Sequence, residues 1–222
     1  MSAPRVERLL TISRRIADPI DPLFAELYEA LLRSSGLSLE GVRLALTHHL
    51  ETSVSADDLT KLLASVSSAP RCHVVLSANV CVAALRAIVL AVATSDVVLI
   101  KPSRRDPWLA ELLVREGAPR LRELGVALSL TSSLAVHAGD EVHFYGGAEA
   151  ALAVRTQLPA GASVRVHGPG FGLAYVDAQS SLEDAARLLA QDVVPFDQQG
   201  CLSPRVAFVA GRTSECSVSP SA

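Results

Sequence analysis

The sequence predicts an α/β protein: a doubly wound, mainly parallel sheet with an N-terminal helical segment. Two observations predict this fold. After residue 70, short apolar runs rich in β-branched residues alternate with helical stretches of about ten to fifteen residues, which is the pattern of βαβ units. Within each run the apolar residues are continuous rather than alternating, as expected for strands that helices cover on both faces.

Composition supports a folded domain. Of the 222 residues, 50% are hydrophobic and 19% are charged, and the mean hydropathy is +0.34. This much apolar side chain can offset the entropy lost on ordering, which excludes a disordered chain. The length predicts one domain and part of a second. Because aromatic residues make up only 4%, the core must consist of Ala, Val, Leu and Ile.

The net charge argues against a nucleic-acid partner, and the length of the most apolar segment argues against a membrane span. Twenty basic and 23 acidic residues give a net charge of −3, which argues against a nucleic-acid partner bound by phosphate neutralisation. The most apolar stretch, residues 80–93, contains Arg86 and falls short of the roughly 20 residues that a membrane span needs. Four cysteines without a C-x-x-C spacing argue against a disulfide framework. We therefore expect the protein to reside in a reducing cytoplasm.

The first seventy residues are predicted to be helical. Asp21-Pro22 provides an N-cap and an N1 proline, and Gly36 provides a stop. A second helix is expected over 38–50, and Ser55–Asp58 resembles a capping box that opens a short third helix. The segment Ser65–Pro70 is a candidate linker.

Strands and helices then alternate along the rest of the chain. The expected strands are 73–76, 96–100, 126–130, 141–145, 164–167 and 173–176, and the expected helices are 82–93, 106–116 and about 148–157. We divide the chain into an N-terminal helical segment (1–69), a nucleotide-binding α/β domain (70–195), and the start of an incomplete catalytic domain with a tail (196–222).

Ligands of such sheets bind beyond the carboxyl ends of the strands. Two segments there could meet a phosphate: Lys101–Arg105, with three cations, and Gly146-Gly147, which follows a strand and opens a helix. A solvated basic turn and an ordinary tight turn are the alternatives. The pair His48-His49 has no acidic or Cys partner at ligand spacing, so no metal site is expected.

The segment Asp197–Pro204 is the most informative about a possible catalytic residue. Its Cys201 follows a glycine within a polar, irregular loop, although free cysteines are usually buried and inert. Arg205 could favour the thiolate if it lay close in space.

Taken in order, five motifs resemble the aldehyde dehydrogenase superfamily, and in particular its acyl-CoA reductase (LuxC-like) branch. The resemblance runs from about residue 35 to 209. It also implies a sheet of the aldehyde dehydrogenase cofactor-binding type. The motifs are Ser77-Ala-Asn79-Val80, Lys101-Pro-Ser103, Phe144-Tyr-Gly-Gly147, His167-Gly-Pro-Gly-Phe-Gly172 and Asp197-Gln-Gln-Gly-Cys-Leu-Ser-Pro-Arg205.

The resemblance implies a role for each matching residue. Cys201 would be the nucleophile that attacks an acyl-CoA thioester, and Asn79 would stabilise the oxyanion. A nicotinamide cofactor would be held by a second group of residues: Lys101, Ser103, Arg104, Gly146 and Gly147.

Three departures from the family pattern refine this interpretation. His167 stands where aldehyde-oxidising relatives have a glutamate base, which favours reduction. Arg104 stands where NAD-preferring relatives often have a glutamate, which predicts NADPH. Relatives also continue well beyond the cysteine loop. A truncated catalytic domain would impair turnover, and it implies a homo-oligomer or a partner chain that completes the domain.

The leading hypothesis is therefore NADPH-dependent reduction of a long-chain acyl-CoA to the aldehyde through an acyl-cysteine thioester. The alternative is a non-catalytic nucleotide-binding remnant or a partner-dependent subunit. A third possibility is an acyl carrier that transfers its acyl group from Cys201 without hydride.

Overall fold

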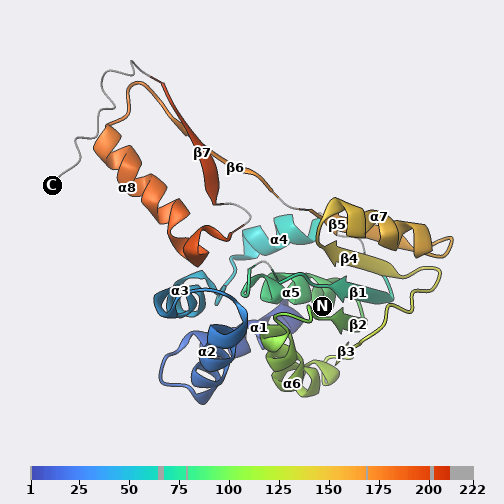
Figure 1. The fold of residues 1–222 in the computed structure, drawn as a ribbon. Helices are drawn as coiled ribbons and strands as arrows, with labels where there is room; N and C mark the ends of the chain where they lie inside the picture. Colours follow the sequence, from blue (N-terminus) through green and yellow to red (C-terminus); the bar gives the residue numbers. More distant parts are fainter. Residues whose placement is uncertain (1, 65–67, 79, 169, 201–202, 211–222) are drawn as a thin grey trace. The chain divides into compact units, whose positions relative to one another are not determined.

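The computed structural model describes residues 2–64, 68–78, 80–168, 170–200 and 203–210 (Figure 1). The chain forms two compact units, Met1–Pro169 and Gly170–Ala222. We describe each unit by itself. The domain boundaries expected after residues 69 and 195 stay predictions.

The first unit begins with a helical segment, as predicted. The Asp21 carboxylate accepts the Leu23 backbone N–H at 2.9 Å and caps α2. The Ser55 hydroxyl accepts the Asp58 N–H at 3.0 Å, which confirms the capping box at the start of α4. The expected second helix is split into an α-helix and one π-helical turn. The elements are α1 (Ser2–Ala17), α2 (Pro22–Ser34), α3 (Leu39–Leu44), η1 (Ala45–His49) and α4 (Ala56–Ala64).

A five-stranded, fully parallel sheet follows, in the order β3-β2-β1-β4-β5. The mainly parallel sheet that the sequence predicts is confirmed. Its strands are β1 (Arg71–Val75), β2 (Val97–Lys101), β3 (Ala127–Leu130), β4 (Glu141–Tyr145) and β5 (Ser163–His167). Three helices connect them: α5 (Ala83–Thr94), α6 (Trp108–Arg122) and α7 (Ala148–Gln157).

Helices cover both faces of the sheet. Since parallel crossovers are right-handed, the connections β1-α5-β2 and β4-α7-β5, which run in opposite directions along the sheet, place α5 and α7 on opposite faces. Helix α5 packs on β1 and β2, and Ala151 of α7 is buried against Val142 and Phe144 of β4. Aliphatic side chains dominate this core, as the composition requires.

Helix α6 continues to Arg122, beyond the expected end near Glu116. Tertiary packing favours the longer helix, although it includes Gly117 and Pro119, two poor helix formers. A Cβ on Gly117 would lie 2.9 Å from the Leu9 side chain of α1, so the glycine permits close approach of the two helices. Leu121 is fully buried on the following turn. This burial stabilises the last turn despite the proline.

The second unit pairs two parallel strands, β6 (Gly172–Val176) and β7 (Pro204–Val209). Between them lie α8 (Leu182–Val193), which the Ser181 side chain caps, and the 3₁₀ turn η2 (Pro195–Gln198). Among the described residues of the whole chain, no helix is both long and apolar enough to cross a bilayer.

Candidate functional site

The strand order defines one crevice at the carboxyl edge of the sheet. From β1 the chain proceeds through α5 to β2 on one side, whereas β4 leads through α7 to β5 on the other. The crevice between the ends of β1 and β4 is therefore the topological switch point, where open α/β sheets bind their ligands. Val75 pairs with Lys101 on one side and with Phe144 on the other. Lys101 and the Gly146-Gly147 turn thus lie at the same edge, flanking the end of β1.

The loop after β2 is tied to the loop after β1. The Leu76 N–H donates to the Lys101 carbonyl at 3.0 Å. The Arg105 guanidinium donates to the Ala78 carbonyl at 2.6 Å, and the Ser103 hydroxyl accepts the Arg105 N–H at 3.3 Å. Arg105, which the sequence grouped with the phosphate-binding cations, therefore holds the loops together.

Two other cations remain available at this edge. Lys101 is half-buried and Arg104 is exposed. Among the residues that the structure describes, neither side chain forms an ion pair. Both are free to meet an anionic ligand.

The two glycines after β4 have different surroundings. A Cβ on Gly146 would lie 2.8 Å from the Phe144 ring, whereas a Cβ on Gly147 would meet nothing within 4 Å. Gly147 is also the N-cap of α7, and no side chain caps this helix start. A ligand can therefore approach the backbone at Gly147 and the N–H groups of the first turn, where a phosphate is favoured. The exposed Glu149 in that turn opposes an anion, so the cations across the crevice must outweigh it.

These features fit a phosphate-bearing cofactor. The crevice combines an open helix N-terminus, a glycine whose Cα is accessible, and two unpaired cations on the facing loop. Arg offers a forked pair of donors to phosphate and Lys offers a point charge.

A polar cluster that sequence reasoning missed lies beside the glycine turn. Tyr145 stacks on His167 with ring centroids 4.2 Å apart, and His167 lies 5.6 Å from His143. Burial lowers the pKa of both histidines and raises the pKa of Tyr145 to about 12. The His167 carbonyl accepts the Gly146 N–H at 3.4 Å. The only signal in the sequence was the alternation of polar residues along two adjacent strands.

The segment that leads to Cys201 has an unusual backbone. Phe196, Asp197 and Gln198 all have positive φ, between 49° and 62°, a region that costs non-glycine residues free energy and recurs at functional sites. A Cβ on Gly200 would lie 2.8 Å from the Ser203 hydroxyl, so a larger residue here would require that hydroxyl to move. The Ser203 N–H donates to the Gly200 carbonyl at 3.2 Å.

Two predicted site residues, Asn79 and Cys201, lie outside the described residues. Two other cysteines, Cys72 and Cys81, are free and buried. Burial raises the pKa of each thiol to about 12, so neither is suited to act as a nucleophile near neutral pH. In the described part of the chain, no group of His, Cys, Asp and Glu side chains could hold a metal ion.

The sheet and its helices form the fold that solved aldehyde dehydrogenases share. A benzaldehyde dehydrogenase from Corynebacterium glutamicum matches 94% of this chain and 50% of its own, with 21% identity and a TM-score of 0.64. An acetylating aldehyde dehydrogenase from Geobacillus thermoglucosidasius matches 96% and 50%, with 15% identity and a TM-score of 0.70. More specifically, residues 40–217 match the family of acyl-CoA reductases (LuxC), and the chain belongs to that family.

Curated relatives agree with this assignment. The long-chain acyl-protein thioester reductase of Aliivibrio fischeri is 28% identical over 149 residues, and that of Photorhabdus luminescens is 30% identical over 149 residues. Each match covers 61% of this chain and 31% of the relative. The aligned part of the chain thus spans about a third of the length of these curated relatives.

Proposed function

We propose that this chain takes part in the NADPH-dependent reduction of a long-chain acyl-CoA to the aldehyde through an acyl-Cys201 thioester. The observation that carries the proposal is the crevice at the switch point: Lys101 and Arg104 lie at the end of β2, the open Gly147 turn lies at the end of β4, and the end of β1 is between them. Membership of the LuxC family and the chain's similarity to long-chain acyl-protein thioester reductases support the acyl substrate.

In the proposed first step, the Cys201 thiolate attacks the thioester carbonyl. The tetrahedral intermediate collapses, the carbon–sulfur bond to CoA breaks and the CoA thiolate leaves, so that an acyl-Cys201 forms. The Asn79 amide would donate to the developing oxyanion, a contact worth roughly 2.7–4 kcal/mol in mutational precedents.

The bound cofactor would supply a hydride to the acyl carbon. The thiohemiacetal that results on Cys201 then loses the aldehyde, and the cysteine is regenerated. Lys101, Ser103 and Arg104 would hold the cofactor's ribose and its phosphate, and Gly146 and Gly147 would accommodate the remaining phosphates. His167 in place of a glutamate base is consistent with a reaction in which no water needs activating.

Intact mass after incubation with tetradecanoyl-CoA tests the first step. We expect an adduct with the mass of one acyl group, lost in Cys201→Ser and retained in Cys216→Ser, the matched control. Addition of NADPH should then discharge the adduct and release tetradecanal. An unmodified protein would overturn the covalent step, and an adduct that NADPH leaves unchanged would overturn the reduction.

A further inference from the structure

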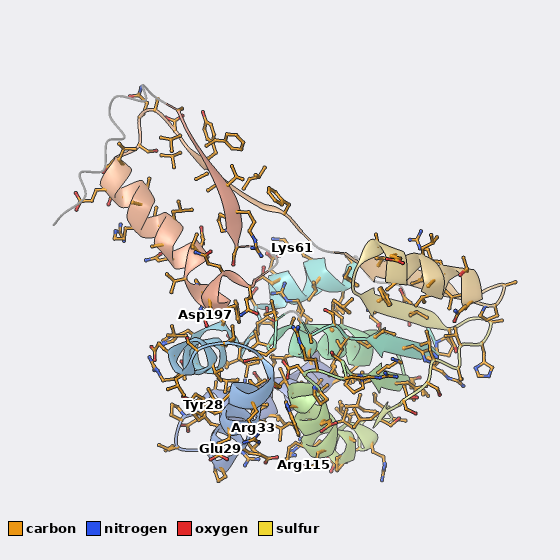
Figure 2. All side chains as sticks on the ribbon, in the orientation of Figure 1. Tyr28, Glu29, Arg33, Lys61, Arg115 and Asp197 are labelled. Carbon is orange, nitrogen blue, oxygen red and sulfur yellow. The ribbon has the colours of Figure 1, made fainter. Side chains whose placement is uncertain are left out.

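The end of β4, where the glycine turn begins, is held from both faces of the sheet. Helix α7 lies along one face of β4 and β5 (Figure 2), and Phe144 is buried there beside Ala151. Because side chains alternate along a strand, Tyr145 faces the opposite side. It pairs with His167 in the register of β4 with β5. The last residue before Gly146 is therefore packed on the neighbouring strand, on the face away from α7.

Tyr145 and His167 form a close, nearly parallel stack. Their ring centroids are 4.2 Å apart and the ring planes differ by only 5°. Burial, and after it the charges of His143 and Arg165, lower the pKa of His167, so its ring is uncharged near neutral pH. Its Nε2 is buried, and among the described residues nothing hydrogen-bonds to that atom. What His167 offers Tyr145 is therefore the face of its ring.

A second pair of side chains supports this stack on the same face of the sheet. The ring of His143 lies 5.6 Å from that of His167 and is fully buried. One carboxylate oxygen of Glu141 lies 3.4 Å from His143 Nε2 and 3.7 Å from Arg165 Nε. Since a single buried carboxylate holds both side chains, His167 packs against a neighbour that is itself fixed.

The glycine turn that follows β4 depends on its neighbours for a fixed conformation. Glycine has more backbone freedom than any other residue, and a Cβ on Gly147 would meet nothing within 4 Å. Among the described residues, one hydrogen bond joins these glycines to another strand, and it runs from the Gly146 N–H to the His167 carbonyl at 3.4 Å. Both ends of this bond adjoin the stack, because Tyr145 precedes Gly146. Loosening the stack should therefore loosen the turn.

We propose that Tyr145 and His167 are positioning residues, whose stack holds the Gly146-Gly147 turn in the conformation that leaves the start of α7 open to an anionic ligand. The proposal rests on the proposed function in one respect, namely that the ligand is the cofactor. A turn that is already ordered binds its ligand without the free-energy cost of ordering. His167 stands where aldehyde-oxidising relatives have a base, but in this role it contributes its ring and not a proton.

Fluorescence titration of matched variants with NADPH tests the proposal. Tyr145→Leu and His167→Leu each remove one ring of the stack and should weaken NADPH binding about fivefold at unchanged stoichiometry. A loss of fold would instead lower the fraction of chains that bind. Tyr145→Phe and His167→Phe keep a stacking ring and should bind as the unaltered protein does. Tyr175→Leu, the same change at an exposed tyrosine of the second unit, is the control and should also leave binding unchanged.

A double variant shows whether the two rings act as one unit. The protein that carries both Tyr145→Leu and His167→Leu should bind NADPH no more weakly than either single variant, because one change already removes the stack. Additive effects would overturn the proposal, as would full affinity in Tyr145→Leu. Equal losses in His167→Phe and His167→Leu would also overturn it, since the effect would then belong to the imidazole nitrogens.

Hydrogen exchange at the Gly146 amide separates this proposal from the proposed function, because it needs no cofactor. Exchange should be about fivefold faster in Tyr145→Leu than in the unaltered protein, and Tyr145→Phe should restore the slow rate. Equal exchange in Tyr145→Leu and in the unaltered protein would overturn the positioning role, whatever the protein binds. If the unaltered protein does not bind NADPH, the cofactor assignment is overturned instead, and the exchange experiment still decides the role of the stack.

Discussion

Gly146 lies directly against the ring of Phe144, whereas its neighbour Gly147 faces open space. The two glycines look equivalent in the sequence, yet the structure gives them different reasons to be glycine. Gly146 permits the chain to pass a ring that is itself buried in the cluster beneath α7. Gly147 leaves the start of α7 accessible. Gly146 therefore serves packing, whereas the adjacent Gly147 serves the access of a ligand.

This separation predicts opposite outcomes for two matched substitutions. Gly146→Ala should lower the free energy of unfolding by about 1–3 kcal/mol, because the new methyl group overpacks the Phe144 ring. Gly147→Ala should cost less than about 1 kcal/mol as a change of N-cap residue, but its methyl group should weaken NADPH binding. Urea denaturation and fluorescence titration measure the two effects. The reverse pattern would show that the glycines have been assigned the wrong roles.

Arg104 and Arg105 are a second adjacent pair with different predicted roles. Arg104→Ala should weaken NADPH binding about tenfold and leave NADH binding nearly unchanged, since the proposed partner of Arg104 is the 2′-phosphate. Arg105→Ala removes the hydrogen bond to the Ala78 carbonyl and should weaken both cofactors alike by loosening the loops. Dissociation constants for both cofactors in both variants distinguish the roles. Tighter binding of NADH than NADPH by the unaltered protein would contradict the assignment of Arg104.

The sequence was sufficient to predict the sheet because its strands are short segments with β-branched residues next to turn signals, although polar residues alternate with apolar ones along β4 and β5. Five such segments became the parallel strands, and the two helix starts that were predicted from a side-chain cap lie where Asp21 and Ser55 placed them. The end of α6 was missed because the contact between Gly117 and Leu9 joins residues far apart in the chain. No local pattern reports such a contact. The π-helical turn at Ala45–His49 likewise has no local signal.

The candidate site was predicted only in part for the same reason. Residues at strand ends could be found from the sequence, because parallel strands end at one edge. The sequence did not show that β1 lies between β2 and β4, and this order sets Lys101 and Gly147 on either side of one crevice. The stacking of Tyr145 on His167 depends on the register of β4 with β5, which apolar patterning alone does not fix.

Asp140 makes the stability of the first unit dependent on pH. Its carboxylate accepts the His137 N–H at 2.8 Å and lies 3.1 Å from His73 Nε2. Burial by itself raises the pKa of Asp140, but these hydrogen bonds and the charge of Arg71 outweigh it and hold the pKa below its usual value. A carboxylate whose pKa is lowered by folding stabilises the fold at pH values above its unfolded pKa of about 3.9. This stabilisation is lost as the pH falls through the pKa of the folded state.

Asp140→Asn should therefore destabilise the protein by about 1–3 kcal/mol at pH 7. The difference from the unaltered protein should shrink as the pH falls below about 4, where the native carboxyl also becomes neutral. Asp57→Asn, which breaks an exposed pair with Lys61, is the control and should cost no more than about 0.5 kcal/mol. Denaturation midpoints at several pH values measure both. A constant difference down to pH 3 would show that the charge of Asp140 is not what stabilises the fold.

The four cysteines should differ sharply in reactivity. Burial, aided by the charge of Glu141 near Cys72 and of Asp106 near Cys81, raises the pKa of both thiols to about 12. At pH 8 only about one in ten thousand of these thiols is a thiolate, the form that iodoacetamide attacks. Native protein should therefore be alkylated at Cys201 and Cys216 alone, and urea should expose all four. Peptide mass mapping measures the sites. If Cys201 is an activated nucleophile, its labelling should persist at pH 6, where that of Cys216 becomes slow. Rapid labelling of Cys72 or Cys81 in the folded protein would contradict their burial.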